Sequence, residues 1–144
     1  MAAAVLGETI LSVRPTGRGG NNRLYRIETP ERVVALKLYD PQFDDGLERL
    51  ERERGALSFL GALGSGAVPK LLATDRQAQV LAMEWIDGVV PLPPSESDIV
   101  QALDLARELH AARDSAAARD LGPAREACVS VAELQAQLGS RLER

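Results

Sequence analysis

Two β-rich runs separated by a short turn constrain the fold of this 144-residue chain more than any other feature. Residues 24–27 and 33–39 are rich in β-branched, aromatic and aliphatic side chains, which favour strands. Residues 29–31 lie between them and have the chemistry of a turn that joins antiparallel strands. Because residues 9–13 form a further strand candidate upstream, the sequence predicts a three-stranded antiparallel meander.

One helix and two more strands follow the meander. Leucines recur at helical spacing after Asp44 or Asp45, either of which can cap the helix. The apolar positions are Leu47, Leu50, Leu57 and Leu60, and the stop signals are Gly61 and Gly64. Residues 71–73 and 79–85 are apolar strand candidates joined by a polar turn. We therefore expect an α+β lobe, a five-stranded antiparallel sheet with one helix.

The composition changes after this lobe. Residues 88–97 are rich in proline and serine, and such a stretch is typical of a linker. The sequence therefore predicts a lobe at residues 1–88, a linker at 89–97 and a helical segment at 98–144.

The helical segment is expected to contain two helices with a loop at residues 113–125 between them. Ser95 or Ser97 can cap the first helix, and a second, weaker helix is expected at residues 130–142. The apolar face of the first helix is formed by Ile99, Leu103, Ala106 and Leu109. Unless residues 129–142 or another copy of the chain cover this face, it has no partner, and the sequence therefore predicts either a homodimer or marginal stability.

Charge, hydrophobicity and cysteine content exclude several kinds of partner, a membrane span and an internal disulfide. The net charge of −4 provides no general attraction for nucleic acid or anionic lipid, so we expect neither nucleic acid nor membrane as a partner. No apolar run approaches the roughly 20 residues that span a bilayer. Cys128 is the single cysteine and cannot form an internal disulfide. The expected location is the cytoplasm.

A glycine-rich segment, residues 17–22, lies between two predicted strands within an expected loop at residues 15–22. Backbone N–H groups can approach phosphate oxygens where side chains are missing. The segment is not a Walker loop, because no Gly-Lys-Ser/Thr ends it and no helix follows. The alternative is a glycine-rich hairpin turn without a ligand.

Two charged residues lie at positions where a partner is expected. Strand alternation puts Ala35 and Lys37 on one face of the third strand, so that the lysine emerges beside a small residue. Glu53 lies between Leu50 and Leu57 in the apolar stripe of the helix, where a carboxylate should be paired. The alternatives are a lysine that reaches solvent and local ion pairs along the helix.

The last predicted strand runs directly into the linker. A strand end at a domain junction exposes backbone donors and acceptors that a flat heterocycle can use. The residues concerned are those from Met83 to Gly88. The alternative is a strand edge followed by a turn.

These pieces occur in the order of a protein-kinase-like N-lobe: glycine-rich loop, strand lysine, helix glutamate and hinge. Residues 19–26, Gly-Gly-Asn-Asn-Arg-Leu-Tyr-Arg, resemble the corresponding run of the aminoglycoside phosphotransferases and their choline-kinase and homoserine-kinase relatives. Arg52-Glu53, the leucines after it and Val68-Pro69 are similar to that family's helix and the start of its fourth strand. Residues 83–88 are similar to its hinge.

The resemblance implies a role for each of these residues in ATP binding. Lys37 would contact the α and β phosphates, and Glu53 would hold Lys37 by an ion pair. Ala35 would cover the adenine, with Met83 behind it. The backbone C=O of Glu84 and N–H of Ile86 would contact the adenine edge. The phosphates would be covered by Gly19, Gly20, Asn21 and Asn22.

The family's catalytic motifs are not found after His110, which we expect to be structural. There is no His-x-Asp loop with a downstream Asn and no later metal-binding Asp pattern, and Asp114 and Asp120 lack the surrounding sequence. The resemblance therefore implies an N-lobe plus the start of a truncated second lobe, with ATP and Mg²⁺ as cofactors but no catalytic residue and no metal ligand in this chain.

The resulting hypothesis is the ATP-binding lobe of a small-molecule kinase, which by itself does not turn over. In a full-length parent, the γ-phosphate of ATP would be transferred to a hydroxyl of a small-molecule acceptor. One alternative is a non-catalytic nucleotide-binding or protein-interaction module. Another is an α+β domain whose likeness to kinases is purely structural.

Overall fold

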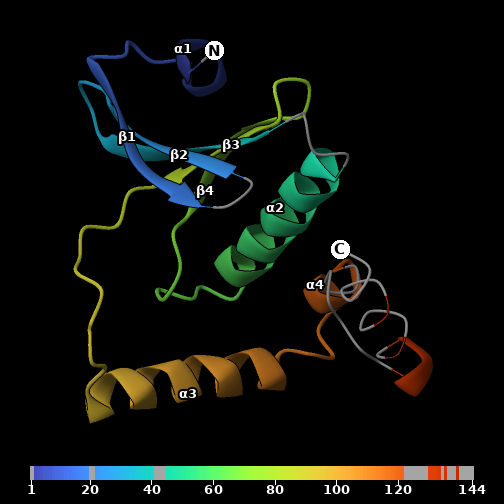
Figure 1. The fold of residues 1–144 in the computed structure, drawn as a ribbon. Coiled ribbons are helices and arrows are strands. Elements are labelled where there is room, and N and C mark those ends of the chain that lie inside the picture. Colours follow the sequence, from blue (N-terminus) through green and yellow to red (C-terminus); the bar gives the residue numbers. More distant parts are fainter. Residues whose placement is uncertain are drawn as a thin grey trace.

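The computed structural model describes residues 2–19, 22–40, 45–121, 130–133, 135 and 139. Five antiparallel strands form one sheet in the order β1-β2-β3-β5-β4 (Figure 1). The strands are β1 (Ser12–Gly19), β2 (Asn22–Glu28), β3 (Val33–Tyr39), β4 (Leu71–Asp75) and β5 (Val80–Glu84). The predicted five-stranded antiparallel sheet is confirmed.

Two helices flank this sheet. α2 (Gly46–Ala62) packs against β3, β4 and β5, while α1 (Ala2–Leu6), which the sequence analysis did not predict, packs against β4. Each helix contributes to a different apolar cluster, because alternate strand residues point to opposite faces. The cluster on the α1 side contains Ile27, Val34, Leu36, Val80 and Ala82, and the cluster on the α2 side contains Tyr39, Leu50, Leu57 and Leu81.

The connection between β2 and β3 confirms the turn predicted at residues 29–31. Thr29 is buried, and its hydroxyl donates to the backbone oxygen of Arg32 at 3.1 Å. The same hydroxyl accepts from the backbone N–H of Arg32 at 3.1 Å and of Glu31 at 3.3 Å. One side chain thereby satisfies the backbone of the turn and fixes the register of the two strands.

The loop expected at residues 15–22 is shorter than the sequence suggested. β1 begins at Ser12, rather than at residue 9, and pairs with β2 as far as Gly19, which lies opposite Asn22. Pro15 is tolerated because β1 is an edge strand, where a missing N–H breaks no central ladder. A bulge between Pro15 and Gly17 accommodates the extra residue. Gly17 and Gly19 therefore extend a hairpin strand instead of belonging to a long loop.

The buried side chains of α2 match the predicted apolar stripe only in part. Leu50 and Leu57 are buried, whereas Leu47 is 38% exposed. Phe59 is also buried, although it lies outside the predicted stripe. Asp45 occupies the N-cap position without a side-chain capping bond. At the other end Gly64 has a φ of 72°, a left-handed conformation that suits glycine and ends the helix.

Residues 85–95 have no regular secondary structure and lead to α3 (Glu96–Ala111), which Figure 1 shows apart from the sheet. Ser95 caps this helix in a capping box with Asp98, as one of the two sequence alternatives stated. No residue of α3 is buried. A short helix, α4 (Ala116–Arg119), lies inside the expected loop at 113–125 and contacts α2.

The helix expected at residues 130–142 falls mostly outside the described residues, although residues 131–133 are helical. The division of the chain at residues 88 and 97 stays a prediction. Within the described part of the chain, no helix is both long and apolar enough to cross a membrane.

Candidate functional site

An ion pair joins the middle of β3 to the middle of α2. The Lys37 Nζ atom lies 2.5 Å from Glu53 Oε2. Lys37 extends from β3 between Leu24 of β2 and Leu81 of β5, its cross-strand partners on the same face. The two side chains remain 22% and 29% exposed, so the lysine is paired and still accessible to a ligand.

Local ion pairs along α2 do not compete for Glu53. Arg54 Nε instead pairs with Glu51 at 2.8 Å, and Arg52 pairs with Glu48 at 2.5 Å. Glu53 therefore pairs with Lys37 and not with a neighbouring arginine of α2. The expected juxtaposition of Lys37 and Glu53 is present.

A third side chain, Tyr39, contacts both members of the pair. Its hydroxyl donates to Glu53 Oε2 at 2.6 Å, and Lys37 Nζ lies 5.3 Å from the centre of its ring. Tyr39 is fully buried, and this burial, reinforced by the hydrogen bond to the Glu53 carboxylate, raises the pKa of Tyr39 well above its ordinary value. One carboxylate oxygen thus accepts from an ammonium and from a phenol that stays protonated.

Tyr39 was not among the predicted site residues, although the sequence contains a signal for it. Tyr39 lies two residues beyond Lys37 in β3 and so shares its face. Strand alternation, which placed Ala35 and Lys37 together, would have placed Tyr39 with them.

Ala35 and Met83 lie opposite each other on β3 and β5. Met83 is partly buried against the apolar cluster under α2. Ala35 is only 5% exposed, and its partner on the other side is Arg26 of β2. These residues share a face with Lys37, so the structure brings together four of the predicted site residues: Ala35, Lys37, Glu53 and Met83.

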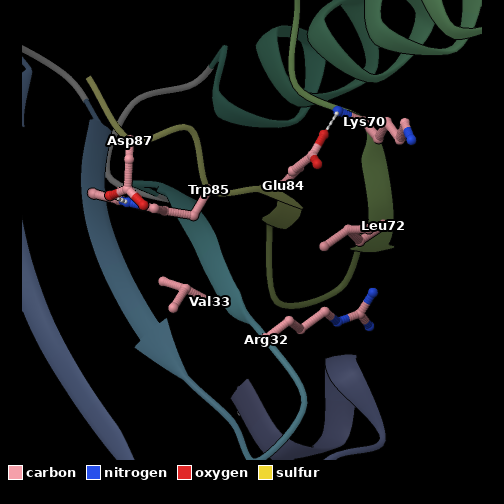
Figure 2. Close-up of a pocket in the computed structure, with 7 residues that line it drawn as sticks. All are labelled: Arg32, Val33, Lys70, Leu72, Glu84, Trp85 and Asp87. Carbon is pink, nitrogen blue, oxygen red and sulfur yellow. Dashed lines mark hydrogen bonds between the residues drawn. The ribbon is translucent and has the colours of Figure 1, made fainter. Parts of the chain in front are cut away.

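Glu84 and Ile86 lie where β5 leaves the sheet. The backbone N–H of Glu84 donates to the backbone oxygen of Lys70 at 2.8 Å, and Ile86 is 57% exposed. A pocket of about 450 Å³ opens at this point (Figure 2). It is lined by Arg32, Val33, Lys70, Leu72, Glu84, Trp85 and Asp87, which include Glu84 but no other predicted site residue.

The glycine-rich hairpin is described only at its two strand ends. Gly19 ends β1 and Asn22 begins β2, whereas Gly20 and Asn21 lie outside the described residues. Asn22 Oδ1 is buried and has no hydrogen-bond partner among the described residues. Asn22 pairs with Tyr39 across β2 and β3, which puts it on the face that carries Lys37.

The described residues differ in what they offer to a phosphate and to Mg²⁺. The described residues contain no group of three or more carboxylate, histidine or cysteine side chains that could hold a metal ion. Magnesium prefers carboxylate and phosphate oxygens in an octahedral arrangement. The described part of the chain therefore fits an anion through Lys37 but offers no ligand set of its own for Mg²⁺.

A comparison with protein families agrees with this geometry. The family described as the phosphotransferase enzyme family (APH) matches residues 12–142. The chain belongs to the phosphotransferase enzyme family. This membership confirms the resemblance inferred from the motifs, and the sheet with α2 is the kinase-like N-lobe expected of a member of that family.

This phosphotransferase-family chain was also compared with curated proteins and with solved structures. No curated protein matches it. Among solved structures, a putative fructosamine-3-kinase from Thermobifida fusca YX-ER1 is 32% identical, with a TM-score of 0.49. The similarity covers 63% of this chain and 31% of that chain, so the chain spans less than a third of the length of that kinase.

Proposed function

We propose that the chain binds ATP and forms the nucleotide-binding lobe of a small-molecule kinase, which transfers the γ-phosphate to a hydroxyl of its acceptor. The observation that carries the proposal is the 2.5 Å pair between Lys37 Nζ and Glu53 Oε2. A half-buried lysine held by a carboxylate keeps its direction while it offers a positive charge to phosphate oxygens.

Each predicted residue has a role in this proposal. Lys37 compensates the charge of the α and β phosphates, and Glu53, itself held by Tyr39, orients Lys37. Ala35 and Met83 contact the base, whose edge meets the backbone of Glu84 and Ile86. The hairpin formed by Gly19, Gly20, Asn21 and Asn22 covers the phosphates. Bound Mg²⁺ would neutralise phosphate charge, and none of its protein ligands is expected in this chain.

The proposal includes three further expectations from the sequence. The chain alone does not turn over, because the residues that would orient an acceptor hydroxyl were not found in it. Its location is the cytoplasm. It forms a homodimer through the apolar residues of α3, three of which are about half exposed: Ile99, Val100 and Leu103.

The exposure of α3 favours a second candidate function. α3 has no buried residue in the described part of the chain, so a protein partner could be held there while the lobe binds nucleotide without catalysis. In that case nucleotide should change the affinity for a partner, and pull-down with and without ATP would measure the change.

Calorimetric titration with ATP, with and without Mg²⁺, tests the main proposal. Lys37→Ala should weaken binding by about 1 to 3 kcal/mol, roughly 5- to 150-fold, as a charge-assisted contact is lost. Lys70→Ala is the matched control, because Lys70 is the other lysine of the chain, is exposed, and bonds to Glu84 through its backbone. Its affinity should stay unchanged.

Two results would contradict the proposal. If the unaltered chain does not bind ATP, or if both lysine variants bind equally well, Lys37 is not part of a phosphate site. Transfer of labelled phosphate from ATP to a small-molecule acceptor by the 144-residue chain alone would overturn the expectation that it does not turn over.

A further inference from the structure

A contact between Arg26 and Trp85 crosses β3 on the face that carries Lys37. Arg26 lies opposite Ala35 in the β2–β3 ladder, so both side chains are on this face. The Arg26 guanidinium lies 5.5 Å from the centre of the Trp85 ring. Because β3 lies between β2 and β5, whose backbones are about 10 Å apart, the arginine must reach across β3 to make this contact.

Both ends of this contact are fixed by hydrogen bonds. The Arg26 guanidinium donates to Glu28 Oε1, and Glu28 Oε2 accepts from the hydroxyl of Ser12 at 2.8 Å. The indole N–H of Trp85 donates to Asp87 Oδ1 at 2.8 Å. The arginine and the tryptophan are therefore positioned side chains rather than two surface groups that meet by chance.

The Arg26 side chain starts beside Ala35, the position expected for the base of a nucleotide, and its guanidinium ends between Glu28 and Trp85, at the level of Val33. Ala35 is only 5% exposed, although a base packed against it would need an open surface. Trp85 follows directly after β5 and so also belongs to the hinge. Its other surroundings include Val33 and Asp87, which Figure 2 shows on the same side of the hinge pocket.

We infer that Arg26 and Trp85 form a lid at the edge of the Ala35 surface, and that the planar aromatic base of a nucleotide binds by replacing the Arg26 guanidinium on the Trp85 ring. This inference rests on the proposed ATP site and names the side chain that receives the base. A guanidinium and a base are both flat groups that stack on an indole, and stacking of a base is at least as favourable as a partly exposed cation–π contact.

The exchange leaves no buried charge without a partner. Arg26 keeps its ion pair with Glu28 when it leaves the ring, since Glu28 lies on the same strand and face, two residues further along. Glu28 in turn keeps its bond to Ser12. The closed lid therefore competes with the base only through the stacking contact. The apparent affinity is the affinity of the open form multiplied by the fraction of molecules in which the lid is open.

The fluorescence of Trp85 tests the inference directly, because it is the only tryptophan of the chain. ATP should change the emission of Trp85 along the same saturation curve that calorimetry gives. Inorganic triphosphate, which carries the anionic chain without a base, should leave the emission unchanged. Calorimetry of Trp85→Leu should give an ATP affinity at least fivefold lower and an unchanged triphosphate affinity.

A pair of arginine variants separates the lid from general charge effects. Arg26→Met removes the competing guanidinium and should raise ATP affinity about two- to fivefold. Arg23→Met is the matched control, because Arg23 lies on the same strand but opposite Leu38, on the other face, where it pairs with Asp40 at 3.2 Å. It should leave ATP affinity unchanged. Cooperative unfolding of each variant verifies that it is folded.

The inference and the proposed function fail in different ways. ATP binding that depends on Lys37 but changes neither the Trp85 emission nor the affinity of Trp85→Leu overturns the lid and leaves the ATP site intact. An equal emission change with triphosphate also overturns it. If no variant binds ATP, both the inference and the proposed function are wrong.

Discussion

Replacing Tyr39 with phenylalanine removes one buried hydroxyl and leaves the ring that packs beneath α2. The hydroxyl donates to a charged carboxylate, Glu53, at 2.6 Å. A hydrogen bond to a charged group typically contributes about 1.5 to 3 kcal/mol. Glu53 keeps Lys37 and is 29% exposed, so water can partly replace the phenol. We expect the lower end, a loss of about 1.5 kcal/mol and a fall of about 5 °C in Tm.

The same substitution predicts a specific pH dependence. The pKa of Tyr39 is raised in the folded protein by burial and by its bond to Glu53, so its contribution is fully present below the unfolded value of about 10 and is lost above it. At pH 11 ionisation in the unfolded chain lowers the stability of the unaltered protein by about 1.4 kcal/mol relative to Tyr39→Phe. The difference of about 1.5 kcal/mol between the two proteins should therefore nearly vanish.

Urea unfolding at pH 7, 9 and 11, followed by circular dichroism, measures both effects. Tyr25→Phe is the matched control, because Tyr25 lies on the opposite face of the same sheet and its hydroxyl has no hydrogen bond among the described residues. Equal stabilities of the two phenylalanine variants at pH 7, or a Tyr39 effect that stays constant between pH 9 and pH 11, would refute the reasoning.

Two further substitutions test the docking of α2 and the cap of α3. Leu50→Ala should lower the free energy of unfolding by about 2 to 5 kcal/mol because Leu50 is fully buried, whereas Leu47→Ala should lower it much less. Urea unfolding compares the two variants, and equal losses of stability would contradict the described docking of α2. Ser95→Ala removes the capping box of α3 and should cost about 1 kcal/mol of local stability. Hydrogen exchange of α3 amides measures that loss, Ser97→Ala serves as the control, and equal protection in both variants would count against the cap.

The sequence predicted the parts of the fold that depend on local chemistry. The turn at Thr29 was readable, and the cap of α3 was narrowed to Ser95 or Ser97, because each requires a particular side chain at a particular backbone position. The extent of β1 was not readable. Glycine and proline usually interrupt strands, and only pairing with β2 on the other side of the hairpin keeps residues 15–19 extended.

The candidate site was predictable where two periodicities coincide. Strand alternation gave the direction of Lys37, and helical spacing placed Glu53 in the stripe of α2, so their meeting required only that the stripe pack on that face. The position of Trp85 was not predictable in this way. It lies after the last residue of β5, where the ladder no longer fixes which side a residue points to, and only its contact with Arg26 reveals the face.

The ion pair itself contributes little to the fold, and its position depends on the apolar residues around it. Leu50 and Leu57 lie on either side of Glu53 along α2 and are buried in one cluster with Tyr39 and Leu81. A shift of α2 by one turn, about 5.4 Å, would take the carboxylate out of reach of Lys37. Because the pair is partly exposed, its Coulomb energy is too small to prevent such a shift. The leucines therefore set the geometry that Lys37 needs, and for this reason Lys37→Ala should cost nucleotide affinity while it leaves the stability of the lobe nearly unchanged.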